Sequence, residues 1–155
     1  MPKVGIVGNG TDKFTARGRQ LAEETILFIL EGENWDAMVS GHSPVGGIDI
    51  WAEEIATILG IPLDLKVPAV NQWDPPGAYG YKARNLDIAH DSDIVHVILA
   101  DVYPVEYHGR RFNACYHHRN GEGAPSVTPV NHVKSGGCWT GKKAANAVWH
   151  IVANY

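Results

Sequence analysis

Hydrophobic residues along the chain form two kinds of segment: short apolar or alternating runs, and longer stretches suited to helices. The short runs are typical of strands and cover residues 4–8, 37–40, 63–67 and 94–99. The longer stretches predict helices over residues 15–31, 49–59, 82–90 and from about 140 onward. Strands and helices therefore alternate. This predicts an α/β fold, a Rossmann-like, doubly wound and mostly parallel sheet with helices on both faces.

The ends and buried faces of two helices can be predicted in more detail. Asp49 is a suitable N-cap for the second helix, which Gly60 and the following Pro62 should end. Its buried stripe is expected to consist of Trp51, Ile55, Ile58 and Leu59. The last helix is expected to place Trp149 in the core and to bury Ala144, Ala145, Val148, Ile151 and Val152.

Residues 101–133 form an irregular insert before the last predicted helix, rich in His, Gly, Pro and Asn. A connection this long without clear elements usually has a function, or is held by something other than a core. The chain has 155 residues, of which 45% are apolar. This length and this share of apolar residues predict one domain over residues 1–155.

The charge is mildly negative, with 13 Lys and Arg against 17 Asp and Glu, for a formal net charge of −4. No run of like charge predicts non-specific binding to nucleic acid or to a membrane surface. The first residues lack a signal-peptide core, and no apolar run reaches the roughly 18–20 residues that span a bilayer. Two cysteines do not make a disulfide scaffold, so we expect a cytoplasmic protein with reduced thiols.

Glycine-rich segments lie at the predicted strand ends or just before helices. Ligands of parallel sheets bind beyond the carboxyl ends of the strands, so one site could collect all of these segments. The candidate ligand-binding and phosphate-binding residues are Gly8, Asn9, Gly10, Ser40, Gly41, Gly46, Gly47, Arg84, Asn85, Gly136, Gly137, Thr140 and Lys142.

The loop over residues 40–49 carries the clearest signal of the three glycine-rich clusters. It passes from strand to helix through Gly41, Gly46 and Gly47, which permit positive φ and a close approach of backbone N–H groups to a ligand. The following helix N-terminus favours a phosphate. The alternative is a tight turn that needs glycine only for packing.

Two further clusters add positive charge. Arg84 opens the third helix and could reach back over the strand ends to a phosphate; the alternative is a solvated surface arginine. Lys142 and Lys143 are expected in the first turn of the last helix, where the helix dipole disfavours them unless an anion lies between. Gly136 to Lys142 also fits the start of a P-loop, but Lys143 stands where Ser or Thr would bind magnesium, which excludes that motif.

In their order along the chain, the segments at residues 39–53, 60–62, 84–85, 93–95 and 136–140 resemble the SLOG superfamily, which includes DprA-like, lonely-guy and YspA-like proteins. The resemblance implies a Rossmann-like fold and a pocket for nucleotides or nucleotide-derived signals. Lonely-guy phosphoribohydrolases carry P-G-G-x-G-T-x-x-E with a catalytic glutamate. In this chain Trp139 replaces a glycine of that motif and Lys143 replaces the glutamate. Members of the superfamily are often dimers or larger, so a homo-oligomer is left open.

Three functions follow from these residues. The first is a nucleotide-binding or sensing module without chemistry of its own. The second is a nucleoside-monophosphate N-glycosidase or other nucleotide-processing hydrolase, with Asp49, Glu53 and Arg84 as catalytic candidates; Glu54 is a further carboxylate. The carboxylates also have an ordinary interpretation as partners of the helix dipole.

The third function is a zinc-stabilised interaction protein. Cys115, His117, His132 and Cys138, with His118 beside them, offer the ligand types of a structural zinc site that would hold the insert in place. Chance clustering among eight histidines is the alternative. Trp73 and Trp139 could stack on a base or pack in the core.

Overall fold

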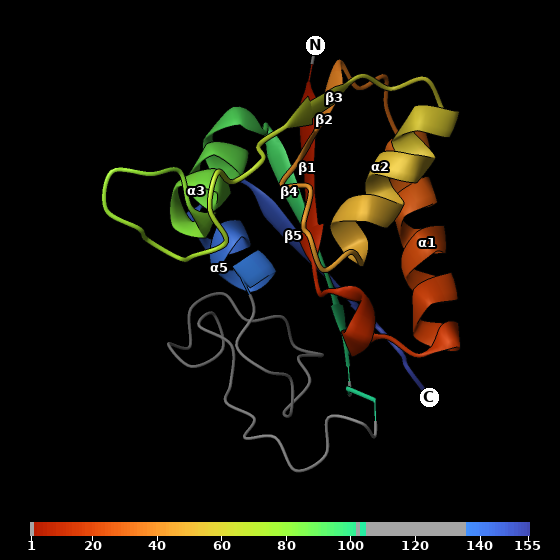
Figure 1. The fold of residues 1–155 in the computed structure, drawn as a ribbon. Coiled ribbons are helices and arrows are strands. Elements are labelled where there is room, and N and C mark those ends of the chain that lie inside the picture. Colours follow the sequence, from red (N-terminus) through yellow and green to blue (C-terminus); the bar gives the residue numbers. More distant parts are fainter. Residues whose placement is uncertain (1, 102, 105–135) are drawn as a thin grey trace.

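The computed structural model describes residues 2–101, 103–104 and 136–155, and its strands form one parallel sheet (Figure 1). The sheet has five strands in the order β3-β2-β1-β4-β5, and every neighbouring pair is parallel. The strands are β1 (Lys3–Gly8), β2 (Ala37–Ser40), β3 (Leu63–Leu65), β4 (Ile94–Ala100) and β5 (Ala147–Val152). The predicted α/β doubly wound class is therefore confirmed.

Helices cover both faces of the sheet. On one face lie α1 (Ala16–Glu31) and α2 (Ile48–Ile58), and on the other lie α3 (Tyr81–Asp91) and α5 (Gly136–Lys143) (Figure 1). The chain builds outward from β1 to β3 and then returns to place β4 on the other side of β1. The direction of winding thus reverses between β1 and β4, which is where open α/β sheets bind ligands.

The core consists of two apolar layers separated by the sheet. Successive side chains of β1 point to opposite faces, so Ile6 packs towards α1 and α2 while Val7 packs towards α3 and α5. Met38 and Val39 in β2 divide in the same way. Because both faces are covered, the central strands are apolar without alternation, which is why they were recognisable in the sequence.

The first two helices begin and end at well-defined residues. Thr15 caps α1, its hydroxyl accepting a hydrogen bond from the Gly18 amide at 3.1 Å. The prediction that Asp49 caps α2 is wrong: Gly47 is the N-cap, with a φ of 79°, and Asp49 lies in the first turn. Gly60 follows the helix with a φ of 74°, as expected of a C-terminal glycine.

The predicted buried stripe of α2 is half correct. Trp51 is buried and Ile55 packs against the same core, but Ile58 is 82% exposed and Leu59 is exposed as well. The helix instead presents the i, i+4, i+8 row to the sheet, and it consists of Ile48, Ala52 and Ala56. The small side chains of this row let the helix lie close to the strands, which turns the larger residues at its end towards solvent.

The predicted last helix is also wrong. Helix α5 begins at Gly136 and ends at Lys143, and residues 147–152 form β5, which pairs with β4 from Val95↔Ala147 to Ala100↔Val152. The apolar face predicted from Ala144 to Val152 therefore belongs mostly to a strand. Trp149, predicted on a helix, lies on β5 and donates its indole N–H to the Cys138 Sγ at 3.2 Å.

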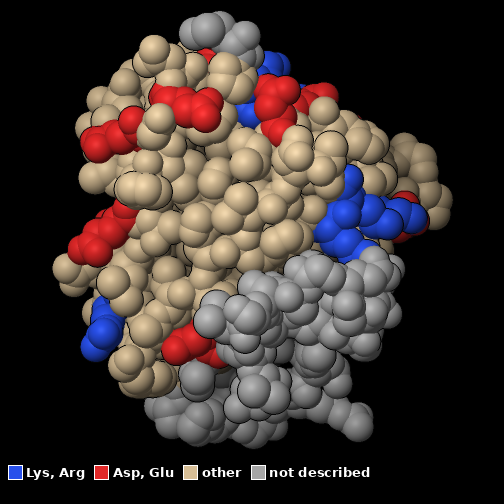
Figure 2. Space-filling model, turned by 180° about the vertical axis from the view of Figure 1, so that it is seen from behind, with Lys and Arg blue, Asp and Glu red and all other residues tan. Residues whose placement is uncertain are grey.

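On the face seen in Figure 2, charged side chains lie in small groups with uncharged surface between them, and at the top of the view acidic and basic side chains adjoin. Within the described residues, none of the helices has the length and apolar character that crossing a membrane requires.

Candidate functional site

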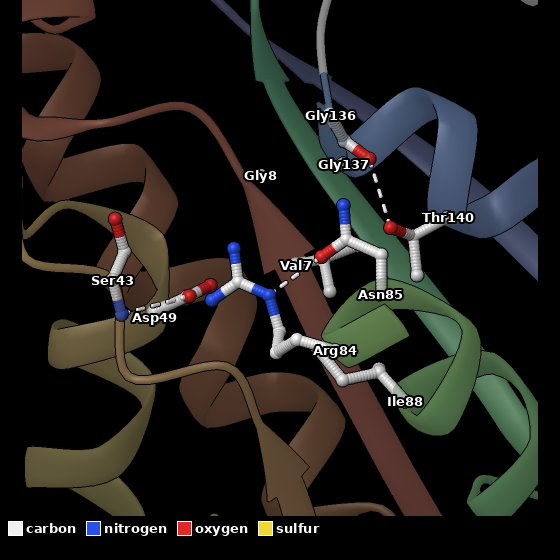
Figure 3. Close-up of a pocket in the computed structure, with 10 residues that line it drawn as sticks. All are labelled: Val7, Gly8, Ser43, Asp49, Arg84, Asn85, Ile88, Gly136, Gly137 and Thr140. Carbon is white, nitrogen blue, oxygen red and sulfur yellow. Dashed lines mark hydrogen bonds between the residues drawn. The ribbon is translucent and has the colours of Figure 1, made fainter. Parts of the chain in front are cut away.

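A pocket of about 110 Å³ lies at the switch point, beyond the carboxyl end of β1 (Figure 3). It is lined by Val7, Gly8, Ser43, Asp49, Arg84, Asn85, Ile88, Gly136, Gly137 and Thr140. Six of these are among the predicted phosphate-binding residues, namely Gly8, Arg84, Asn85, Gly136, Gly137 and Thr140. The fold thus brings to one place segments from four parts of the chain.

The pocket depends on a close backbone contact between α5 and β1. A Cβ on Gly137 would lie 2.9 Å from the Gly8 backbone nitrogen, and a Cβ on Gly8 would lie 2.1 Å from the Ile98 carbonyl oxygen. Glycine at 137 lets the first turn of α5 lie against the end of β1, and glycine at 8 lets the end of β1 lie close to the Ile98 carbonyl of β4. As a result, the N-terminus of α5 opens on the pocket, and the first backbone N–H groups of a helix, which have no partner within the helix, favour an anion.

The lysines of α5 do not take part as predicted. Lys142 and Lys143 lie in the last turn of α5, not the first, because the helix starts at Gly136. Cations are favourable at that end of a helix, so the expected conflict with the dipole does not exist. Lys142 does not line the pocket, and Lys143 lies 5.3 Å from the ring centre of Trp139.

Of the described residues that line the pocket, Arg84 is the cation. The residue is only 8% exposed; its Nε donates to the Asn85 Oδ1 at 2.7 Å and its Nη1 to the Gly41 carbonyl at 2.7 Å. Gly41 is glycine because a Cβ there would meet the Arg84 Nη1 at 2.5 Å. The side chain also lies over the Tyr81 ring, 5.0 Å from its centre. The guanidinium of Arg84 is therefore rigid and buried. This differs from the alternative interpretation of the sequence, which was a solvated surface arginine.

Asn85 extends the polar lining towards α5. Its Oδ1 accepts from Arg84, so its Nδ2 amino group points the other way, and a Cβ on Gly136 would lie 3.7 Å from it. The amino group thus faces the start of α5, as Figure 3 shows. Arg84, Asn85 and the α5 N-terminus together form a set of N–H donors on one side of the pocket.

Asp49 faces the guanidinium of Arg84 from the other side (Figure 3). It is 8% exposed, and its Oδ2 accepts from the Ser43 amide at 3.1 Å. Burial raises the pKa of Asp49 from 3.8 to about 6, although the Arg84 charge and the Ser43 hydrogen bond act in the opposite direction. A carboxyl that titrates near neutrality inside a cleft is typical of functional sites.

We expect Asp49→Asn to stabilise the protein at neutral pH. In the folded state the pKa of Asp49 is about 6 against 3.8 for the free group, so ionisation of the carboxyl opposes folding increasingly as the pH rises from about 4 to about 6, and fully above 6. The free energy of unfolding of the variant should exceed that of the unmodified protein by up to ~3 kcal/mol at pH 7.5. The gain should shrink as the pH falls through 6 and be absent below pH ~4, since Asp49 is then neutral in both states.

Urea unfolding of both proteins at pH 7.5, 6 and 4 measures this difference. The comparison is made between variant and unmodified protein at each pH because His96 and His150, whose pKa values burial lowers, change the stability of both proteins alike. A pH-independent difference would contradict the assignment.

Glu53, the other carboxylate proposed as catalytic, does not line the pocket. Its Oε2 accepts from the Ser40 hydroxyl at 2.8 Å and its Oε1 lies 2.7 Å from the His42 Nδ1. Both oxygens are thus engaged in holding the loop that follows β2. Sequence analysis did not select His42, which has a φ of 51° although it is not glycine. Its position inside a glycine-rich strand-to-helix loop was the available signal.

The remaining predicted glycine-loop residues shape the site without lining it. Asn9 joins strand ends, donating to the Tyr103 hydroxyl at 3.0 Å and accepting from the Ala100 amide at 2.9 Å. Gly10 precedes the short 3-10 helix η1 (Thr11–Lys13). Gly46 and Gly47 have φ values of 72° and 79°, and a Cβ on Gly47 would meet the Asn9 carbonyl at 2.4 Å.

Three of the four predicted zinc ligands, Cys115, His117 and His132, lie outside the described residues, as does His118. The fourth, Cys138, lies on α5, where it is buried and accepts a hydrogen bond from the Trp149 indole N–H. Among the described residues, no three His, Cys, Asp or Glu side chains gather as metal ligands would. Trp73 and Trp139, the two predicted stacking residues, pack edge to face against each other with ring centres 4.9 Å apart.

Comparison of the chain with protein-family models, with curated protein sequences and with solved structures finds no match.

Proposed function

We propose that this chain binds a phosphate-bearing nucleotide or nucleotide-derived ligand in the pocket between β1, α3 and α5, as a binding or sensing module. Membership of the SLOG superfamily, which the sequence resembles, is part of the same proposal. The observation that carries it is the buried guanidinium of Arg84, which lies in a switch-point crevice also faced by the N-terminus of α5.

The donors around the pocket fit a phosphate better than a neutral group. Arg84 uses its Nε–H and one Nη1–H in the bonds to Asn85 and Gly41, which leaves further donors of its planar fork for a ligand. The Asn85 amino group and the backbone N–H groups of α5 add to them. Asp49 supplies the charge that opposes Arg84. Because the pKa of Asp49 is raised, its carboxyl can take up a proton when a phosphate binds and so avoid repelling the ligand.

Isothermal titration with inorganic phosphate, ribose 5-phosphate and nucleoside 5′-monophosphates tests the proposal at low salt. We expect saturable 1:1 binding of phosphate-bearing ligands, with a matching rise in the melting midpoint. A ligand at ~100 times its dissociation constant adds about 2.7 kcal/mol to the folded state. If all of these compounds fail to bind up to millimolar concentration, the glycines serve only for packing and the proposal is wrong.

Asp49 favours a second candidate function, hydrolysis of an N-glycosidic bond in a nucleoside monophosphate. Its carboxyl faces the pocket, and a pKa of about 6 suits proton transfer near neutral pH. Glu53 is less suited because Ser40 and His42 engage both of its oxygens. The activity would be established if the unmodified protein released free base and ribose 5-phosphate and Asp49→Asn did not. Tight binding without release would favour the first function, a binding module.

A further inference from the structure

The pocket is too small for a whole nucleotide. Its volume is about 110 Å³, whereas sites that enclose small organic ligands measure roughly 300–1,000 Å³. A phosphate group with its donors accounts for this space. The rest of any nucleotide must therefore extend into adjoining space.

A second cavity of about 400 Å³ adjoins the pocket at Ser43, which lines both. It lies between the loop after β2, the first turns of α2 and the segment after β3. Its walls are His42, Ser43, Pro44, Gly46, Ile50, Val67, Pro68 and Asn71. Two prolines with Ile50 and Val67 offer flat apolar surfaces, and His42 and Asn71 add hydrogen-bonding groups, a composition typical of ligand sites.

His42 is held in place more firmly than a surface histidine requires. Glu53, itself 7% exposed, accepts from the Ser40 hydroxyl and fixes the His42 Nδ1 at 2.7 Å. The Nδ1 edge is directed at Glu53, so Nε2 lies on the opposite edge of the ring. The positive φ of His42, 51°, is a backbone conformation that costs energy in a non-glycine residue, and such residues gather at functional sites.

We infer that the two cavities hold one ligand, a nucleoside monophosphate whose phosphate lies on Arg84 and whose base lies in the second cavity against Pro44, Val67 and Pro68. The inference rests on the proposed function. It adds that the base is the part of the ligand that gives selectivity. The base is bound by the loop after β2 and by the segment at residues 67–71, with His42 and Asn71 facing its polar edge.

The test compares three ligands of increasing size by isothermal titration of the unmodified protein: inorganic phosphate, ribose 5-phosphate and adenosine 5′-monophosphate, repeated with the guanosine, cytidine and uridine monophosphates. We expect at least one nucleotide to bind at least about 10-fold more tightly than ribose 5-phosphate. The reason is that the base, packed in the second cavity, buries apolar surface of both the ligand and the protein.

Two matched variants test whether the gain in affinity over ribose 5-phosphate comes from the second cavity. Val67→Gln places a longer polar side chain in the second cavity, at a position that is 50% exposed. Ala69→Gln makes the same kind of change two residues away, at an exposed position that does not line the cavity. Val67→Gln should remove the gain over ribose 5-phosphate and leave phosphate affinity unchanged, while Ala69→Gln should change neither. Circular dichroism confirms that both variants are folded.

Each outcome separates this inference from the proposed function. If phosphate and ribose 5-phosphate bind but no nucleotide binds more tightly, the inference is overturned and the phosphate site stands. If a nucleotide gains affinity that Val67→Gln leaves intact, the base lies elsewhere and the inference is again overturned. If no phosphate-bearing ligand binds at all, both fall together.

Discussion

Arg84→Met will lose phosphate binding at least ~100-fold while the protein remains folded. A charge-assisted hydrogen bond contributes roughly 1.5–3 kcal/mol, and the guanidinium can make two to one phosphate. About 3 kcal/mol corresponds to roughly 100-fold in the dissociation constant. Methionine keeps most of the side chain's length and packs against the same neighbours, so the loss reports the charge and the donors.

The removal of Arg84 has a second consequence for Asp49. Without the guanidinium, the pKa of Asp49 rises further, because the charge that opposes the effect of burial is gone. A larger fraction of the carboxyl is then neutral at pH 7, which reduces the buried unpaired charge that the variant retains. We therefore expect only a small change in the melting midpoint of Arg84→Met, in contrast to its large loss of phosphate affinity.

Lys82→Met is the matched control for this prediction. Lys82 lies two residues before Arg84 on the same helix α3, its Nζ contacts Asp74 at 3.5 Å on the exposed surface, and it does not line the pocket. Lys82→Met removes the same charge as Arg84→Met, and because long-range attraction is screened it should change phosphate affinity by less than ~3-fold. Arg84→Lys should fall between the two, since it keeps the charge but lacks the planar fork. Equal losses in Lys82→Met and Arg84→Met would mean that only net charge matters, and the assigned site would be wrong.

Gly8→Ala will destabilise the protein by more than ~3 kcal/mol. The added Cβ would lie 2.1 Å from the Ile98 carbonyl oxygen on the neighbouring strand and 2.7 Å from the Ile48 side chain. Neither the strand nor the first residue of α2 can move without breaking the β1–β4 ladder or the start of the helix. Changes of this size come from a few mechanisms, and overpacking against backbone is one of them.

Two alanine variants in α5 calibrate the effect. Gly137→Ala meets the Gly8 backbone at 2.9 and 3.0 Å and should cost about 1–3 kcal/mol, while moving α5 away from β1 and weakening phosphate binding. In the part of the chain that the structure describes, a Cβ at Gly136 meets only the Asn85 Nδ2 at 3.7 Å, an ordinary contact, so Gly136→Ala should leave stability within ~0.5 kcal/mol. Urea unfolding monitored by circular dichroism measures all three. Similar losses at Gly136 and Gly137 would show that the helix does not rest on β1 as described.

By itself the sequence determined the fold class and most of the site's members. Apolar runs buried on both faces are readable as parallel strands without tertiary information, and they placed β1, β2 and β4. Glycines at strand ends pointed to the pocket, because close backbone approach has a signature in residue type. The Gly136–Gly137 pair was selected on this basis, and Arg84 and Asn85 were selected because they open the third helix, from which an arginine can reach a phosphate. The fold brings these residues together.

Tertiary structure decided the rest. Residues 147–152 carry apolar side chains that suit a helix or a strand, and the free edge of β4 made them a strand. That strand fixed where α5 ends and so moved Lys142 and Lys143 to its last turn. Burial raised the pKa of Asp49, and Glu53 became the partner of Ser40 and His42. Such outcomes depend on which surfaces meet and how much water they exclude, and local sequence does not encode either of these.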